Sequence, residues 1–157
     1  MTAVALDLRR TFGAYPTGVA AIAGIIDGGP VGIAASSFVP VSLDPPLVSV
    51  CVAHTSTTWP TLRRARGIGI SVLGDGQDVI CRQLAAKQGD RFAGLSWHET
   101  AAGGVLLDEA VAWFDCTIEK TVAAGDHDIV LFRIHDLDAV DGAAPLVFHA
   151  SSYRKLA

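Results

Sequence analysis

Residues 32–47 read GIAASSFVPVSLDPPL, and this stretch decides how the rest of the chain is interpreted. The small side chains of residues 34–37 leave the backbone accessible, so a flat ligand could hydrogen-bond to main-chain N–H and C=O groups there. Pro40, Pro45 and Pro46 fix φ and remove donors, which excludes a helix through the stretch. The stretch therefore predicts a stiff wall, although its spacing fits equally well a β-edge followed by a Pro-rich turn.

Segments typical of strands lie on both sides of this wall. Residues 18–26 predict a buried strand, residues 27–30 (DGGP) a tight turn, and residues 31–35 the other arm of a hairpin. Residues 47–52 are rich in β-branched side chains and predict another strand. The wall therefore connects two strands.

The rest of the chain also predicts strands, with short helices between some of them. Further strands are expected at residues 67–73, 111–121, 129–137 and 145–149. Short helices are expected at residues 5–15, from Trp59-Pro60 onward, and at residues 77–87, the last with Val79, Ile80 and Leu84 facing inward. About six strands joined mostly by hairpins predict a mainly β, antiparallel barrel with two or three short flanking helices. The 157 residues fit a single domain, 1–157.

Composition limits the classes of partner. Half of the residues are hydrophobic and only 18% are charged, which predicts that a partner subunit covers apolar surface in a homodimer. The formal charge of -4, with no basic cluster larger than Arg63, Arg64 and Arg66, argues against nucleic acid. The apolar run at residues 17–26 is too short to cross a bilayer, so no membrane association is expected.

The cysteines and histidines indicate neither disulfides nor a metal site. Cys51, Cys81 and Cys116 form no C-x-x-C pair, and no secretory leader precedes them, so we expect buried, reduced thiols in a cytoplasmic protein. The five histidines never occur at i, i+2 or i, i+4 spacing, which argues against metal binding. A dinucleotide fingerprint, a P-loop, an H-E-x-x-H motif and a G-x-S-x-G elbow are all missing from the sequence.

Three short segments could carry chemistry. Residues 55–58 (TSTT), at a predicted helix start, could bind a phosphate, or they could simply cap the helix. Residues 125–127 (GDH) place a histidine at a hairpin tip, where it could serve a ligand or be ordinary surface. Arg91 next to Phe92 could bind phosphate, or could be a surface arginine beside a core aromatic.

Six segments in this order resemble the flavin reductase family, the small reductase components of two-component flavin monooxygenases. They are YPTGV at 15–19, GIAASSF at 32–38, SLDPPL at 42–47, STTWP at 56–60, RFAG at 91–94 and GDH at 125–127. The resemblance covers nearly the whole chain. It implies a split β-barrel homodimer of the FMN-binding type, which binds FMN or FAD and takes a hydride from NADH or NADPH.

The resemblance also implies roles for individual residues. The isoalloxazine ring and ribityl chain would be lined by Ala35, Ser36, Ser37, Phe38 and Ser42. The phosphate would be held by Ser56, Thr57 and Arg91, with Phe92 packed nearby. His127 would position the hydride donor. Where many members of the family carry a threonine in the wall, this chain has Ala34, which removes one hydroxyl.

The expected function is therefore NAD(P)H-dependent reduction of FMN or FAD, supplying reduced flavin to a partner monooxygenase. One alternative is a split-barrel protein that binds flavin without turning over pyridine nucleotide. Another is a structural dimer subunit without a ligand. The GDH turn at residues 125–127 favours the enzyme, because a binding-only protein has no need of it.

Overall fold

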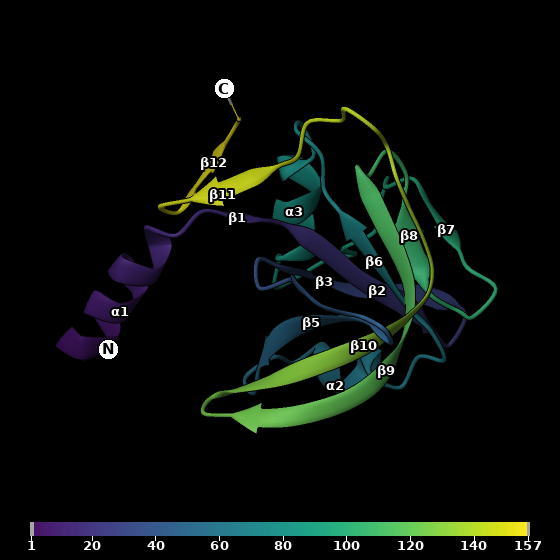
Figure 1. Cartoon of the computed structure of the whole chain (residues 1–157), viewed down its shortest axis with the longest axis horizontal. Helices are drawn as coiled ribbons and strands as arrows, with labels where there is room; N and C mark the ends of the chain where they lie inside the picture. Colours follow the sequence, from purple (N-terminus) through teal and green to yellow (C-terminus); the bar gives the residue numbers. More distant parts are fainter. Residues whose placement is uncertain (1, 157) are drawn as a thin grey trace.

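The computed structural model describes residues 2–156, which form three helices and twelve strands (Figure 1). The helices are α1 (Ala3–Gly13), α2 (Trp59–Leu62) and α3 (Asp78–Leu84). The strands are β1 (Thr17–Gly18), β2 (Ala20–Ile26), β3 (Gly29–Ala35), β4 (Val39–Leu43), β5 (Pro46–Ala53), β6 (Ile68–Val72), β7 (Trp97–Glu99), β8 (Val105–Leu107), β9 (Ala112–Ala124), β10 (His127–Ala139), β11 (Val147–His149) and β12 (Ser152–Arg154). The predicted mainly β architecture is confirmed.

The strands form three antiparallel sheets. The largest has seven strands in the order β3-β2-β6-β9-β10-β5-β4, and β1-β11-β12 and β7-β8 form the two smaller ones. Strands β3 and β4 are the two edges of the large sheet. The stretch 32–47 therefore runs from the end of one edge strand, along the whole of the other edge, and into β5.

The sheet has apolar side chains on both faces, which explains why β2 is an unbroken apolar run. Successive side chains of a strand point to opposite faces. Ala20 and Ile22 accordingly belong to one core cluster, with Phe132, while Ala21 and Ala23 belong to another. Between them the two clusters fix the positions of β2 and its neighbour β3.

The predicted β2–β3 hairpin is confirmed, with a tighter turn than expected. Asp27 and Gly28 both have positive φ, 52° and 80°, as a two-residue type I′ turn requires. Gly29 and Pro30 already belong to β3, where Pro30 pairs with Ile25. Because β3 is an edge strand, a proline can occupy it without breaking the sheet.

Four strands were not predicted. Pro40 interrupts the strand pattern of β4, but β4 lies at an edge and tolerates it. β7, β8 and β12 have only three residues each, too few to show an alternating pattern. The prediction that Val79 faces inward was wrong: α3 packs through Cys81 and Leu84, three residues apart, and Val79 is exposed.

The prediction of three buried thiols was also wrong in one case. Cys81 and Cys116 are buried, and burial raises the pKa of the Cys116 thiol to about 12. Cys51 is exposed, because β5 directs Val50 and Val52 into the core and its alternate residues to the other face. None of the three forms a disulfide within the described residues.

Helix α1 stands apart from the sheets at the N-terminal end of the chain (Figure 1). It has no buried residue, and its apolar side chains Val4, Leu6, Leu8 and Phe12 are exposed. Across residues 2–156, no helix combines the length and the apolar character that crossing a membrane requires.

Candidate functional site

A hollow of about 360 Å³, called here the central hollow, lies at the end of β3. Its lining comes from four parts of the chain: Ile33, Ala34, Ala35, Ser36 and Ser37; Cys51, Val52 and Ala53; Ser56; and His127. The predicted wall, the hydroxyl cluster and the GDH turn therefore converge in space although they are far apart in the sequence.

Strand pairing explains the convergence at His127. His127 opens β10 directly opposite Ala53, the last residue of β5. The pairing continues past the strand end, where the His54 N–H donates to the Asp126 carbonyl at 2.9 Å. The GDH turn is thus attached to the segment that leads into Ser56.

Two neighbouring serines of the wall have different roles. The register that pairs Val39 with Ser49 would place Ser37 opposite Cys51. The Ser37 hydroxyl makes the contacts there: it accepts from Cys51 N at 2.9 Å and donates to Cys51 O at 3.1 Å. No hydrogen bond engages the Ser36 hydroxyl among residues 2–156, so it is available to a ligand.

Two histidine–aspartate pairs lie where the end of β5 meets the start of β10, and of their four residues His127 lines the central hollow. His127 Nδ1 is 2.7 Å from Asp126 Oδ1, which leaves Nε2 for other contacts. The hydrogen bond from His127, and then its charge, lower the pKa of Asp126. His54 Nε2 lies 2.9 Å from Asp128 Oδ1. Sequence reasoning identified His127 but neither aspartate partner.

A second hollow, of about 350 Å³, is called here the cationic hollow. It is lined by Pro30, Val31, Gly32, Thr57, Thr58, Lys87, Gly89, Asp90, Arg91 and Phe92. Arg91 is held in place by two backbone carbonyls, Ala86 O at 2.9 Å from Nε and Gly32 O at 3.2 Å from the guanidinium. Two predicted phosphate residues, Thr57 and Arg91, are therefore brought together here.

Ser56 and Phe92 also have structural roles. The Ser56 hydroxyl accepts from Trp59 N at 3.1 Å and so caps α2, which supports the capping interpretation of the TSTT segment. Phe92 is buried, and a Cβ on Gly32 would lie 2.8 Å from its ring. The close approach of Phe92 to β3 therefore requires glycine at position 32.

The structure does not bring the remaining two predicted residues into either hollow. Phe38 packs against Phe114, with ring centroids 5.4 Å apart, next to the core. Ser42 lies on β4 opposite Leu47. Neither residue lines the central or the cationic hollow.

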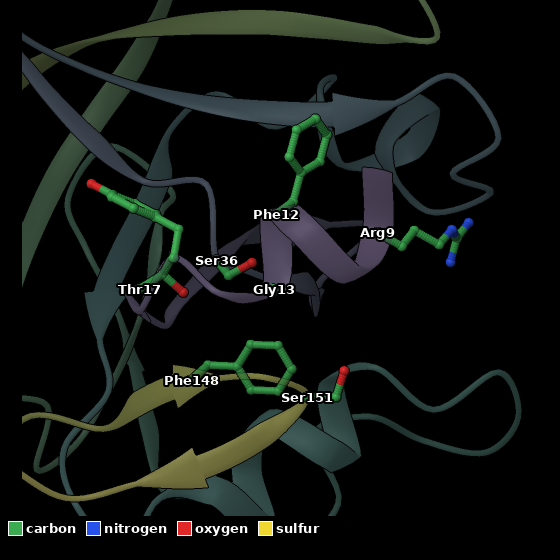
Figure 2. A pocket seen from close by; sticks show the side chains of 8 residues that line it. Arg9, Phe12, Gly13, Thr17, Ser36, Phe148 and Ser151 are labelled. Atoms are coloured by element: carbon green, nitrogen blue, oxygen red, sulfur yellow. The ribbon is translucent and has the colours of Figure 1, made fainter. Parts of the chain in front are cut away.

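A third hollow, of about 480 Å³, lies on the other side of Ser36. Figure 2 shows α1 with Phe12 and Gly13 on one side of it and Phe148 and Ser151 on the other. Ser36 also lines a smaller hollow of about 180 Å³ with Ala34, Ala35 and Tyr153, so its free hydroxyl borders three hollows.

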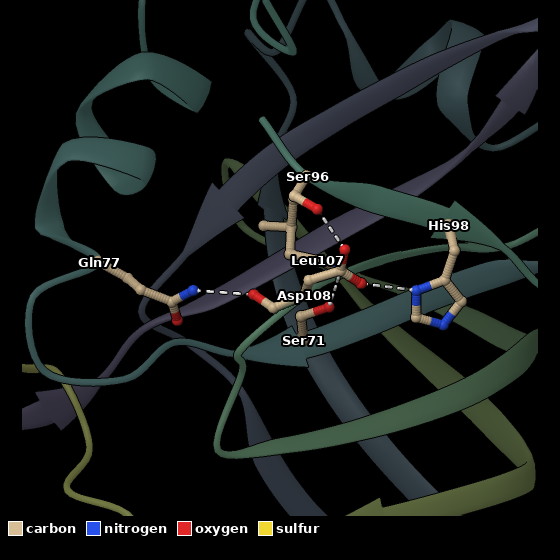
Figure 3. Close-up of polar contacts among 6 residues, drawn as sticks. All are labelled: Ser71, Gln77, Ser96, His98, Leu107 and Asp108. Atoms are coloured by element: carbon tan, nitrogen blue, oxygen red, sulfur yellow. Dashed lines mark hydrogen bonds and ion pairs between the residues drawn. The ribbon is translucent and has the colours of Figure 1, made fainter. Parts of the chain in front are cut away.

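A separate polar cluster, the Asp108 network, lies beside β7 and β8 (Figure 3). The Asp108 carboxylate accepts from Ser96 Oγ and lies 2.9 Å from His98 Nδ1. These contacts lower the pKa of Asp108, the Ser96 hydrogen bond most. The Asp108 carbonyl accepts from Gln77 at 3.1 Å. Across residues 2–156, no group of three or more His, Cys, Asp or Glu side chains is arranged to hold a metal ion.

Comparison with known proteins shows the family. The flavin reductase like domain family matches residues 12–157. A flavin reductase of Pseudomonas putida is 37% identical over 146 residues, covering 92% of this chain and 86% of that protein. The reductase subunit HsaB of a flavin-dependent monooxygenase of Rhodococcus jostii is 35% identical, covering 98% of this chain and 80% of that protein.

Solved structures agree. The NADH:FAD oxidoreductase SgcE6 of Streptomyces globisporus, in complex with NAD and FAD fragments, superposes with a TM-score of 0.91 at 32% identity, covering 98% of this chain and 93% of that chain. The predicted mainly β, antiparallel fold is thereby confirmed as one that this chain shares with a solved flavin-reducing enzyme. The domain match over residues 12–157 and the identity to these relatives show that this chain belongs to the flavin reductase family.

Proposed function

We propose that this protein is an NAD(P)H:flavin oxidoreductase, which binds FMN or FAD and reduces it with NADH or NADPH. The observation that carries the proposal is the convergence of Ser36, Ser56 and His127 on the central hollow. A barrel edge with no ligand would not bring the wall, the hydroxyl cluster and the GDH turn to one place. The names of the relatives, as flavin reductases and reductase subunits, support the same reaction.

The residues present fit a flavin. The small side chains of Ala34, Ala35 and Ser36 leave the β3 backbone accessible to a flat ring along one side of the central hollow. The central hollow is lined by no Lys, Arg, Asp or Glu, whereas the cationic hollow carries Arg91 with Thr57. The ring would therefore lie in the central hollow and the phosphate in the cationic hollow.

Bound flavin supplies the redox chemistry, by accepting a hydride from the reduced nicotinamide ring. The protein supplies proximity and orientation. Ser36 and the backbone of β3 orient the ring, Thr57 and Arg91 hold the phosphate, and His127 positions the nicotinamide at the open side of the hollow. Asp126 restrains the His127 ring through its 2.7 Å contact with Nδ1, so that Nε2 can face the ligand. No side chain is required to act as a general acid or base.

We further propose that the reduced flavin passes to a partner monooxygenase. This part rests on the names of the relatives, since HsaB of Rhodococcus jostii and a trigonelline monooxygenase component of Acinetobacter baylyi are reductase partners of such enzymes. We also propose that the protein works in the reducing cytoplasm, since its three cysteines form no disulfide within the described residues. Residues 1–157 would form one flavin reductase-like domain.

The assembly we propose is a homodimer. Two apolar surfaces lack a cover: α1, through Leu6 and Phe12, and the edge strand β4, through Val41 and the 98% exposed Leu43. An exposed edge strand with apolar side chains is a site for pairing or packing with another subunit. Sedimentation velocity of the purified protein should give one species of twice the chain mass. A monomer at micromolar concentration would contradict this assembly.

The reaction is tested by mixing the purified protein with FMN or FAD and with NADH or NADPH, while the nicotinamide absorbance band is followed. We expect oxidation of at least one nucleotide with at least one flavin. Flavin binding, detected by fluorescence quenching, without oxidation in any combination would support the alternative of a binding-only protein. Neither binding nor oxidation would leave only the structural subunit.

A further inference from the structure

Both chain neighbours of His127 are bonded to one residue of the facing segment, His54. The His54 N–H donates to the carbonyl of Asp126, the residue before His127, at 2.9 Å. The His54 side chain contacts the residue after it, with Nε2 2.9 Å from Asp128 Oδ1. An ionised carboxylate can only accept, so Nε2 carries the proton in this contact. His54 therefore holds the chain on both sides of His127.

These contacts extend a strand pairing that ends beside the central hollow. The pairing of β5 with β10 stops at Ala53 and His127. Past this pair, the two hydrogen bonds that join residues 54–58 to residues 124–128 within the described part of the chain both come from His54. Ser56 lies on the first of these segments and His127 on the second, and both line the central hollow. The position of His127 relative to Ser56 therefore depends on His54.

The side-chain contact of His54 with Asp128 lies outside the central hollow. Both residues line a hollow of about 270 Å³ together with Arg63, and neither lines the central one. Successive side chains of a strand point to opposite faces, so Asp128 points away from the side that His127 occupies. The Asp128 side chain is 24% exposed and that of His54 is 47% exposed, so water screens their contact only in part. His54 thus acts on the central hollow through His127 and not by touching a ligand there.

We propose, as an extension of the proposed function on which it rests, that His54 is a positioning residue for hydride transfer, whose contact with Asp128 fixes His127 against the nicotinamide. A small displacement of such a group lowers the rate steeply, because the reacting atoms must meet in a near-attack geometry. The flavin contacts proposed for Thr57 and Arg91 do not involve His54. Loss of the His54 side chain should therefore lower the turnover of NAD(P)H while flavin affinity is kept.

The test compares His54→Ala and His54→Gln with the wild type, by steady-state kinetics at saturating flavin and by flavin titration. His54→Ala keeps the backbone bond to Asp126 and loses the side-chain contact. We expect its kcat/KM for NAD(P)H to fall about 5 to 20-fold and its flavin dissociation constants to stay within about 2-fold. In His54→Gln an amide nitrogen replaces Nε2 as the donor, so kcat/KM should stay within about 3-fold of the wild type.

The same contact can be removed from its other side. Arg63 lines the same hollow and could replace His54 as the partner of Asp128 in His54→Ala. Asp128→Ala removes the acceptor for both cations, and its kcat/KM should fall at least as far as that of His54→Ala. Asp128→Ala also keeps the proposal testable where His54→Ala does not fold.

A double-mutant cycle separates positioning from a purely structural role. In a His127→Ala background, His54→Ala should lower kcat/KM by less than about 2-fold further, because the residue through which it acts is already lost. A loss that comes from stability alone would be the same in both backgrounds. The matched control is His98→Ala, which removes a histidine–aspartate contact of the same 2.9 Å length in the Asp108 network and should keep wild-type kinetics.

Three results would overturn the positioning role and leave the proposed function standing. They are a wild-type kcat/KM in both His54→Ala and Asp128→Ala, an equal fold loss for His54→Ala in the wild-type and His127→Ala backgrounds, and an equal loss in His98→Ala. If the wild-type protein oxidises neither NADH nor NADPH with either flavin, the proposed function fails and the positioning role fails with it.

Discussion

The central hollow and the Asp108 network are both rich in polar side chains, yet they use them in opposite ways. In the Asp108 network the polar groups satisfy one another: buried Ser71 accepts from Leu107 N at 2.9 Å, and buried Gln77 bonds to both Gly74 N and the Asp108 carbonyl. In the central hollow the Ser36 hydroxyl has no bond within residues 2–156, and the backbone of β3 is accessible. In a structural cluster the polar groups form hydrogen bonds with one another, whereas a binding site keeps donors and acceptors free to form hydrogen bonds with its ligand.

This difference separates two kinds of histidine. His98 and His127 each lie beside one aspartate, at 2.9 Å and 2.7 Å. His98 and Ser96 contact the same Asp108 carboxylate, while His127 lines a hollow together with Ser36 and Ser56. The surroundings of the pair, and not the pair itself, therefore distinguish a ligand-binding histidine from a structural one.

Replacing His127 tests this distinction most strongly. For His127→Ala we expect nearly unchanged flavin affinity and a kcat/KM for NAD(P)H that is about 10 to 100-fold lower, on the order of 1.4 to 2.7 kcal/mol of lost transition-state binding. The matched control is His135→Ala on the same strand, where the ring contacts Thr117 at 2.7 Å and lies outside the hollows. Steady-state kinetics with saturating flavin measure both. A variant with wild-type kcat/KM would remove His127 from the reaction.

The next largest effect should come from Ser56, which lines the central hollow, and Thr57, which lines the cationic hollow. Replacing both Ser56 and Thr57 by alanine should weaken FMN by about 5 to 10-fold more than riboflavin, since riboflavin lacks the phosphate and each lost hydrogen bond contributes about 0.5–1.5 kcal/mol. Titrations followed by flavin fluorescence measure both constants. Thr57→Ala alone separates binding from capping, because only Ser56 bonds to Trp59 N. Equal losses for the two flavins would mean that this segment only caps α2.

Much of the fold could be predicted because local signals agreed with it. The Asp27-Gly28 turn and the GDH turn are strong hairpin signals, and the strands they join are long. β4 was missed because a proline in an edge strand looks the same in a sequence as one in a loop. Val79 was assigned inward because α3 is too short for helical periodicity to be decisive.

The site could be predicted in its members but not in its hydrogen bonds. Its segments stood out by their residue types, and the family resemblance supplied their roles. Their convergence depends on pairings such as Ala53 with His127, which join positions far apart in the chain. That Ser37 is engaged and Ser36 is free depends on the register of β4 with β5. The Asp108 network escaped notice because β7 and β8, which flank it, are too short to be recognised.

Breaking the Asp108 network should reduce stability without reducing activity. The Asp108 side chain is 41% exposed, so water screens its contacts in part, and we expect Asp108→Asn to lower the free energy of unfolding by only about 1 kcal/mol at neutral pH. Its pKa is lowered in the folded state, so this contribution is present above the unfolded pKa and is lost as the pH falls through the folded pKa. The deficit should therefore shrink below about pH 4.

Urea denaturation at neutral and acidic pH measures the Asp108 effect, with Asp141→Asn, an exposed residue, as the control. Flavin reduction should be unchanged in both variants. A loss of activity in Asp108→Asn at full stability would show that the network is a second functional site, and the contrast with the central hollow would no longer hold.

The smallest effects should separate the two adjacent serines of the wall. Ser37→Ala removes both bonds to Cys51 and should lower the free energy of unfolding by about 0.5–1 kcal/mol, because Cys51 is exposed and water can replace part of what is lost. Ser36→Ala should leave stability unchanged and weaken flavin binding by about 2 to 5-fold, the contribution of one neutral hydrogen bond. Denaturation and flavin titration of the two variants in parallel measure this. If Ser36→Ala lowered stability and left flavin binding intact, the Ser36 hydroxyl would serve the fold and not a ligand. The wall would then be only a barrel edge.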